Sequence, residues 1–208
     1  MRVESIHPND LSDGDIAAWR SYLAANPELS SPYLTPDWAA LVARHRSDVR
    51  VVVYRDDAGE PLGFLAVQRS GDYAAMPAGG PICDYQALVA KPGVTLDLAL
   101  APKALAVGRI DLTAGLVNNA VGSRLLTSDA GHVVRFADGY EAWCAERLAT
   151  GTKTIVKTRK KLAKMTRDLG DAVTFDAFST DPHAFEMLMT WKREQMKRTG
   201  VRDIFEHA

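Results

Sequence analysis

The chain has 208 residues, of which 47% are apolar and 25% are charged, and its formal net charge is −1. These are the values of a globular protein, so wholesale disorder is excluded, and a nearly neutral chain does not suit DNA binding. The sequence has no run of 18 apolar residues and its N-terminus lacks a signal-peptide core, so we expect a cytoplasmic protein without a membrane span.

The first third of the chain predicts a strand, two helices and a hairpin. Ser12 or Asp13 suits a helix N-cap, and Thr35 followed by Pro36 gives the same start signal. Two β-branched runs flank the turn sequence Asp-Asp-Ala-Gly, which predicts a hairpin. We therefore expect a strand over 3–6, helices over 13–26 and from 36, and strands over 49–54 and 62–68.

The middle of the chain has weaker signals. Gly79, Gly80 and Pro81 break regular structure, so we expect a loose segment over 74–93. A helix entered or bent at Pro102 is expected over 96–105, followed by a strand over 107–112. Loops are expected at Asn118-Asn119 and Ser128-Asp129, and another strand over 132–136.

The last part of the chain predicts three helices and one strand. The helices are expected over 140–148, 152–169 and 182–199, the last capped by Asp181 and ended by Gly200, and the strand over 173–178. The order of elements favours a mixed α/β domain with a hairpin-rich sheet over a doubly wound parallel sheet.

The predicted helix over 152–169 differs from the rest of the chain in charge. Residues 152–167 hold seven cations and no acid, while Ile155, Leu162, Met165 and Leu169 share one face. Residues 1–150 carry 13 basic and 18 acidic groups, a net −5, and residues 151–208 carry 12 and 8, a net +4. The helix either faces an anion or an acidic surface, or is a plain solvated face.

The sequence lacks the motifs of several nucleotide-binding and catalytic sites. The sequence has no Walker-type glycine loop, no dinucleotide fingerprint, no nucleophile elbow and no His-Glu-x-x-His pair. Its five histidines are scattered, and Cys83 and Cys144 have no ligand spacing, so we expect no metal site and two reduced thiols.

Two residue pairs are the candidate sites that the residues themselves suggest. Asp84 and Tyr85 follow a glycine-rich approach, where a carboxylate and a phenol can accept and donate hydrogen bonds to a ligand. Trp191 and Lys192 place an aromatic ring beside a cation, which suits a sugar or nucleotide ring. Either pair can instead be structural, with Tyr85 or Trp191 in the core.

The order of segments resembles a known family. It runs PYLTPDW, VVVYRDDAGEPLGFLAVQR, CDYQALVAKPG, VGRIDL, TKTIVKTRKKLAKMTRDLGDAVTFDAF and KREQMKRTG. This is similar to the CelD/BcsL-type acyltransferases of the GNAT superfamily, which are associated with cellulose and exopolysaccharide biosynthesis. The resemblance extends from about Pro32 to Ile204 and lies in the order of the segments.

The resemblance implies a tandem protein. Residues 1–150 would be an N-terminal GNAT-like domain, and residues 151–208 the basic helix, strand and helix that open a second one. It also implies acyl transfer from acetyl-CoA or another acyl-CoA to an amino group of a sugar or related polysaccharide precursor. For such a reaction this chain's own candidates are Asp84 and Tyr85 as catalytic residues and Trp191 and Lys192 for the saccharide acceptor. Arg159, Lys160 and Lys164 are the candidates to steer a CoA phosphate or an anionic acceptor.

The chain departs from the family after Gly200. The family signature Arg/Gln-x-x-Gly-x-Gly/Ala, whose backbone amides hold the pyrophosphate, has no counterpart in VRDIFEHA. We therefore expect an incomplete second half. Two alternatives stay open: a FemAB-like aminoacyl transferase, whose RNA-containing donor would suit the basic helix, and a non-catalytic binding or assembly module, which would form a homodimer.

Overall fold

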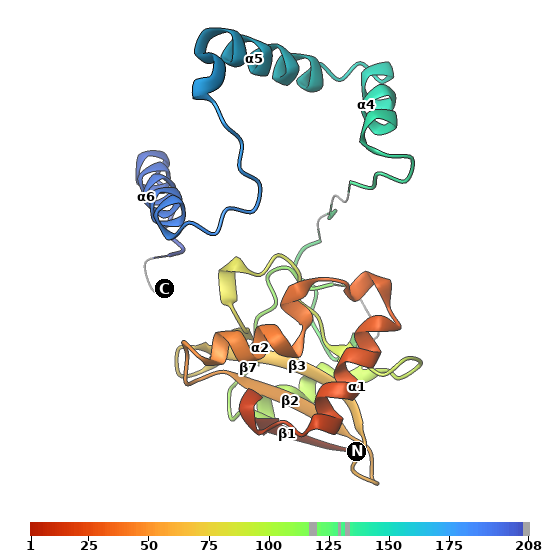
Figure 1. Ribbon diagram of the computed structural model, residues 1–208. Coiled ribbons are helices and arrows are strands. Elements are labelled where there is room, and N and C mark those ends of the chain that lie inside the picture. The colour runs from red at the N-terminus through yellow and green to blue at the C-terminus, as the bar shows by residue number, and fades with distance from the viewer. Residues whose placement is uncertain (117–119, 129, 132–133, 206–208) are drawn as a thin grey trace. The chain divides into compact units, whose positions relative to one another are not determined.

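The computed structural model describes residues 1–116, 120–128, 130–131 and 134–205. Contacts divide the chain into two compact units, Met1–Leu126 and Thr127–Ala208 (Figure 1). Helix α4 (Tyr140–Ala149) therefore falls in the second unit, whereas the predicted first domain extends to residue 150. That the units correspond to two halves of a tandem GNAT protein stays a prediction.

The first unit is built on a mixed six-stranded sheet. Its strands are β1 (Arg2–Ile6), β2 (Arg50–Arg55), β3 (Pro61–Ser70), β4 (Ala74–Pro77), β5 (Val89–Ala90) and β7 (Arg109–Ile110). The order is β1-β2-β3-β4-β7, and β5 pairs with β3 beside β4. All neighbours are antiparallel except β4 and β7, which are parallel. The predicted mixed α/β class is confirmed.

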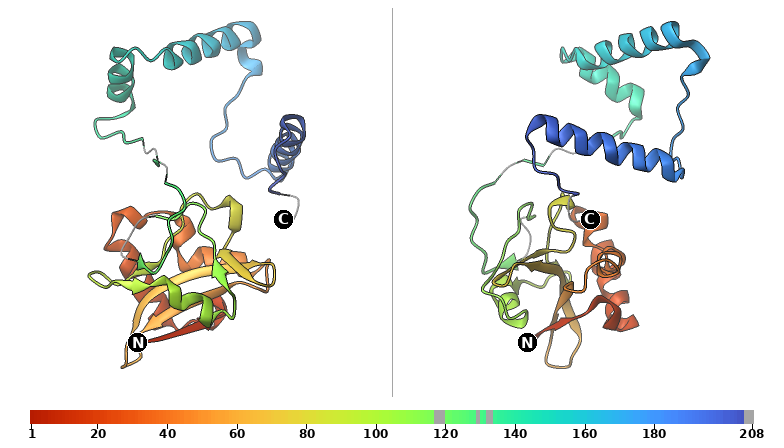
Figure 2. Two further views of the ribbon diagram at one scale, coloured as in Figure 1. Left: turned by 180° about the vertical axis from the view of Figure 1, so that it is seen from behind. Right: turned by 90° about the vertical axis from the view of Figure 1, so that its left-hand side faces the viewer.

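Helices cover both faces of this sheet (Figure 2). On one face, α1 (Asp13–Ala24) and α2 (Pro36–Ala43) form a core with alternate residues of the central strands, including Val51, Val53 and Phe64. On the other face, α3 (Ala101–Ala104) packs near Val52 and Leu65. Strand β2 is thus buried on both faces, which explains its continuous apolar run.

The predicted helix starts of the first unit are confirmed. Ser12 and Asp15 form a capping box at α1, and Thr35 Oγ1 accepts a hydrogen bond from the Trp38 amide (3.1 Å) at α2.

Short 3₁₀ helices make several of the connections: η1 (Pro8–Asp10), η2 (Pro27–Leu29), η3 (Pro32–Leu34), η4 (Gly80–Ile82), η5 (Leu98–Leu100) and η6 (Gly170–Ala172).

The structure corrects the prediction for residues 74–112. The loose segment contains β4, β5 and η4. The expected helix over 96–105 is split into β6 (Leu96–Asp97), η5 and the short α3, because β6 pairs with β8 (Ala120–Val121) and Pro102 has no amide to continue a helix. The strand expected over 107–112 is reduced to β7.

The described parts of the second unit hold α4, α5 (Thr154–Leu169) and α6 (Pro182–Thr199), as predicted. The prediction of a strand over 173–178 is wrong, because the described residues form no strand there. Phe175 and Phe178 are 92% and 99% exposed. Residues 134–136 are not a strand either, while residues 118–119, 129 and 132–133 of the predicted loops and strand lie outside the described residues.

The helices of the second unit bury little. Within the described residues of Thr127–Ala208, Cys144 is the only buried residue. The apolar residues Leu162 and Leu169 of α5, which share the face opposite the cations, are more than half exposed. In the described chain, no helix is both long and apolar enough to cross a membrane.

Candidate functional site

The candidate site in the first unit is the turn that follows β4. Gly79 has φ 94°, and a Cβ there would lie 2.6 Å from the Trp38 ring, so only glycine fits. The Gly79 amide donates to Gln68 Oε1 (2.8 Å) and Trp38 Nε1 donates to the Ala78 carbonyl (2.8 Å). The turn is therefore fixed by side chains of β3 and α2.

Gln86 fixes the chain just beyond this turn. Its side chain is buried, its Oε1 accepts from the Thr113 amide (2.8 Å) and the Ala114 amide (3.3 Å), and its Nε2 donates to the Cys83 carbonyl (3.4 Å). Gln86 is not among the site residues that the sequence predicts. A single polar residue followed by the apolar run Ala-Leu-Val-Ala was the available signal, because a buried amide needs partners.

Asp84 and Tyr85 lie between these two anchors. Asp84 is exposed and Tyr85 is half-buried, and neither side chain has a hydrogen-bond partner among the described residues. Burial raises the pKa of the adjacent Cys83 thiol to about 11, a hydrogen bond with Trp38 opposes this rise, and the Asp84 charge adds to it. The two predicted catalytic side chains are thus available, but within the described part of the chain no hydrogen bond orients them.

Tyr85 lines a small cavity beside β3, between the part of β3 that pairs with β4 and the part that pairs with β5. The other lining residues include Trp19, Tyr33, Phe64, Cys83 and Gln86, and the cavity volume is about 10 Å³. This is room for about one water molecule. Asp84 does not line this cavity, and the cavity does not hold a pantetheine arm in this conformation.

The predicted CoA-binding residues lie on α5. Arg159, Lys160 and Lys164 are all exposed, and Arg159 Nη2 donates to Glu141 Oε2 of α4 (3.0 Å). This ion pair is exposed on both sides, so it contributes little to stability. Within the described chain, Lys160 and Lys164 have no ion-pair partner, which leaves both ammonium groups free for an anion.

The predicted acceptor-binding residues lie on α6. Trp191 is 61% exposed, which does not support the core alternative, and Lys192 Nζ makes only a long contact with Gln195 Oε1 (3.5 Å). Asp84 and Tyr85 belong to the first unit, and the other five candidates belong to the second. Each group therefore stands as a separate candidate.

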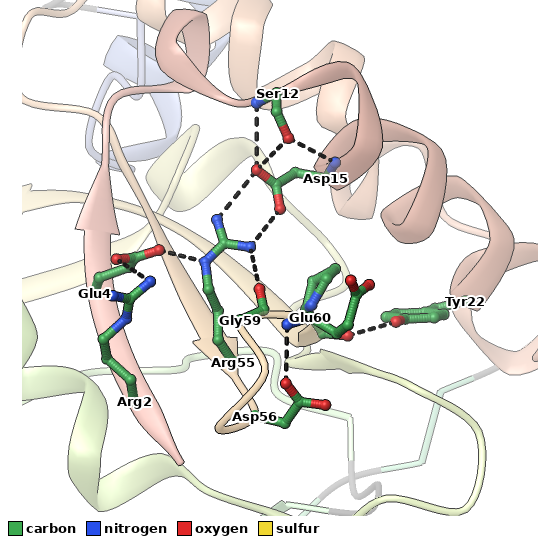
Figure 3. Close-up of polar contacts among 10 residues, drawn as sticks. Arg2, Glu4, Ser12, Asp15, Tyr22, Arg55, Asp56, Gly59 and Glu60 are labelled. Atoms are coloured by element: carbon green, nitrogen blue, oxygen red, sulfur yellow. Dashed lines mark hydrogen bonds and ion pairs between the residues drawn. The ribbon is translucent and has the colours of Figure 1, made fainter.

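The densest charge cluster of the first unit is structural (Figure 3). Arg55 donates to both carboxylate oxygens of Asp15 (2.7 and 3.1 Å) and to Glu4, and so connects β2 with α1 and β1. Burial would raise the pKa of Asp15, but the hydrogen bonds and charge of Arg55 and the bonds from Ser12 lower it. Both carboxylate oxygens of Asp15 accept hydrogen bonds within the cluster, so the cluster attaches α1 to the sheet and leaves no free oxygen for a ligand.

In the described ranges, no three His, Cys, Asp or Glu residues gather as metal ligands would. Comparison of the chain with protein-family models, curated proteins and solved structures finds no match.

Proposed function

We propose that the chain is a GNAT-type N-acyltransferase, or a module of one, that moves an acyl group from acyl-CoA to an amino group of a sugar or related polysaccharide precursor. The observation that carries the proposal is the exposed cationic face of α5. Lys160 and Lys164 are one helical turn apart and free of ion pairs among the described residues, so both can contact one phosphate group of CoA.

The mixed sheet of the first unit and the order of segments that resembles the CelD/BcsL family support the same proposal. In such a reaction the amine nitrogen attacks the thioester carbonyl, a C–N bond forms and the C–S bond breaks. The proton lost by the amine passes to a carboxylate, directly or through water, and the departing thiolate takes up a proton. Asp84 is the candidate for the first role and Tyr85 for the second, as a site of the first unit that stands separate from the cations of α5.

The test is acetyl-CoA binding by the 208-residue chain, followed by thiol release with amino-sugar acceptors. Lys160→Gln/Lys164→Gln is expected to weaken acetyl-CoA binding by about tenfold. Lys197→Gln/Arg198→Gln removes the same charge from α6 and is the matched control, with unchanged affinity expected. Equal affinity of both double variants would remove α5 from the proposed site.

The catalytic roles have their own readout. Asp84→Asn and Tyr85→Phe are expected to lower kcat without changing the affinity for acetyl-CoA. Unchanged kcat in both variants would exclude the pair. Binding of aminoacyl-tRNA, falling steeply with salt, together with no binding of acetyl-CoA, would favour the FemAB-like alternative.

A second candidate function is a non-catalytic binding or assembly module. The specific observation in its favour is the small cavity beside Tyr85, which does not accept a thioester arm as it stands. A stable dimer that binds neither acetyl-CoA nor CoA would support this reading and contradict acyl transfer. Sedimentation of the chain in the presence and absence of acetyl-CoA distinguishes the two.

A further inference from the structure

A polar groove of about 280 Å³ opens on the α3 side of the sheet in the first unit. Its floor comes from β1 to β4 and its other wall from Leu105 and Val107, which follow α3. The groove exists because α3 has only four residues and leaves the end of the sheet uncovered. It is distinct from the turn that carries Asp84 and Tyr85.

Two arginines on neighbouring strands line the groove. Arg50 pairs with Val67 in the β2–β3 register, so Arg50 and Arg69 are diagonal neighbours on one face of the sheet. Diagonal residues of an antiparallel pair are roughly 7–8 Å apart at the backbone, within reach of long side chains. The two guanidinium groups therefore share this groove.

Each arginine is positioned by backbone carbonyls. Arg50 is half-buried, and its Nη1 donates to the carbonyls of Ser47 (2.9 Å) and Val49 (2.6 Å). Arg69 is exposed and makes long contacts with the carbonyls of Asp72 (3.4 Å) and Leu105 (3.5 Å). Among the described residues, neither guanidinium is within ion-pair distance of a carboxylate, so both positive charges are uncompensated.

The one carboxylate that lines the groove is already neutralised. Asp48 forms an ion pair with Arg46 (2.7 Å) and accepts the backbone amide of Arg69 (3.2 Å). Burial would raise its pKa, but the hydrogen bonds and charge of Arg46 lower it. Ser5 and Ser47 add hydroxyl groups to the lining. The groove thus presents two positive charges and neutral hydrogen-bonding groups.

We propose that this groove binds a small phosphorylated metabolite, of about the size of a monosaccharide phosphate, whose phosphate group bridges Arg50 and Arg69. Two like charges at a diagonal position repel, and a dianion between them removes the repulsion. The volume lies just below the range of drug-sized ligand sites, about 300–1,000 Å³, so the groove suits one sugar-sized group with its phosphate and not a whole cofactor. This site is independent of the proposed acyl transfer.

The test is calorimetric titration of the full chain at low ionic strength with glucose 6-phosphate, glucose, inorganic phosphate and succinate. Glucose 6-phosphate and phosphate are expected to bind, glucose to show no binding, and succinate to bind more weakly. Arg50→Gln and Arg69→Gln should each weaken glucose 6-phosphate binding by about tenfold. Arg20→Gln, on α1 outside the groove, removes one positive charge that is already paired with Asp37 and should bind like the original chain.

Several results would overturn the proposal. They are equal binding of glucose and glucose 6-phosphate, succinate binding as tight as phosphate, unchanged affinity in both variants, and no binding below about 10 mM. Should a glutamine variant unfold, Arg50→Lys keeps the positive charge and is expected to lose only part of the affinity, because it loses the planar fork. Unchanged affinity for glucose 6-phosphate in a folded Arg50→Lys would contradict a phosphate contact through the Arg50 guanidinium.

Discussion

Arg55, at the end of β2, and Asp15, in the first turn of α1, form a bidentate ion pair with N–O distances of 2.7 and 3.1 Å. The Asp15 side chain is 5% exposed and that of Arg55 is 12% exposed. Asp15 also accepts from the amide and the hydroxyl of Ser12. One carboxylate therefore caps α1 and attaches it to the sheet.

Replacing Asp15 with Asn is expected to destabilise the first unit by about 3 kcal/mol, because Arg55 would lose its bidentate partner while largely buried. Urea unfolding monitored by tryptophan fluorescence measures the loss. Asp37→Asn removes an equivalent charge from the exposed pair with Arg20 and should cost less than about 1 kcal/mol. Equal losses in the two variants would show that burial of the Asp15 pair does not matter.

The same pair predicts a pH dependence. The pKa of Asp15 in the folded protein is below its ordinary value of 3.8. Its contribution to stability is therefore fully present above the unfolded pKa and is lost as the pH falls through the folded pKa. The difference in unfolding free energy between the original chain and Asp15→Asn should stay constant from pH 7 to about pH 5 and shrink below pH 4. A difference that grows on acidification would contradict this assignment.

Cys83 is expected to react slowly with thiol reagents. Burial raises its pKa to about 11, so little thiolate exists at neutral pH, and its Sγ contacts the Ala78 carbonyl (3.1 Å). Iodoacetamide at pH 8, followed by peptide mass spectrometry, should label Cys83 only after unfolding in urea. Rapid labelling of Cys83 in the folded chain would show that the turn after β4 opens.

The second unit is expected to exchange its amide hydrogens much faster than the first. Among the described residues, α5 and α6 bury almost no side chain, and most of a helix's stability in a protein comes from packing of its apolar face. Hydrogen–deuterium exchange by mass spectrometry should show protected peptides over β2 and β3 and weakly protected ones over α5 and α6. Protection of α5 and α6 equal to that of β3 would mean that another surface covers their apolar residues.

Local sequence signals predicted the helix starts and the hairpin, because the residues that form each of them are close in sequence. Three helices begin at a residue whose side chain caps the helix: Ser12, Thr35 and Asp181. The strands β2 and β3 pair across a short turn. The strand expected over 173–178 failed because a strand needs a partner, and alternation alone does not supply one.

The features that the sequence did not predict depend on contacts between residues far apart along the chain. Residues 96–97 pair with 120–121, far along the chain, and this pairing replaced the start of a predicted helix. For the candidate site, the adjacent pair Asp84-Tyr85 was visible in the sequence. The anchoring role of Gln86 and the meeting of Arg50 with Arg69 depend on contacts between segments, which no local pattern contains.

Thermal unfolding of the 208-residue chain with and without millimolar acetyl-CoA tests the proposed function most directly. Acetyl-CoA at about 100 times its dissociation constant adds about 2.7 kcal/mol to the stability of the form that binds it. We predict a rise in Tm of several degrees with acetyl-CoA, reduced in Lys160→Gln/Lys164→Gln. An unchanged Tm in a chain that unfolds cooperatively would contradict acyl transfer from acetyl-CoA by this chain and leave the FemAB-like transferase and the binding module as the alternatives.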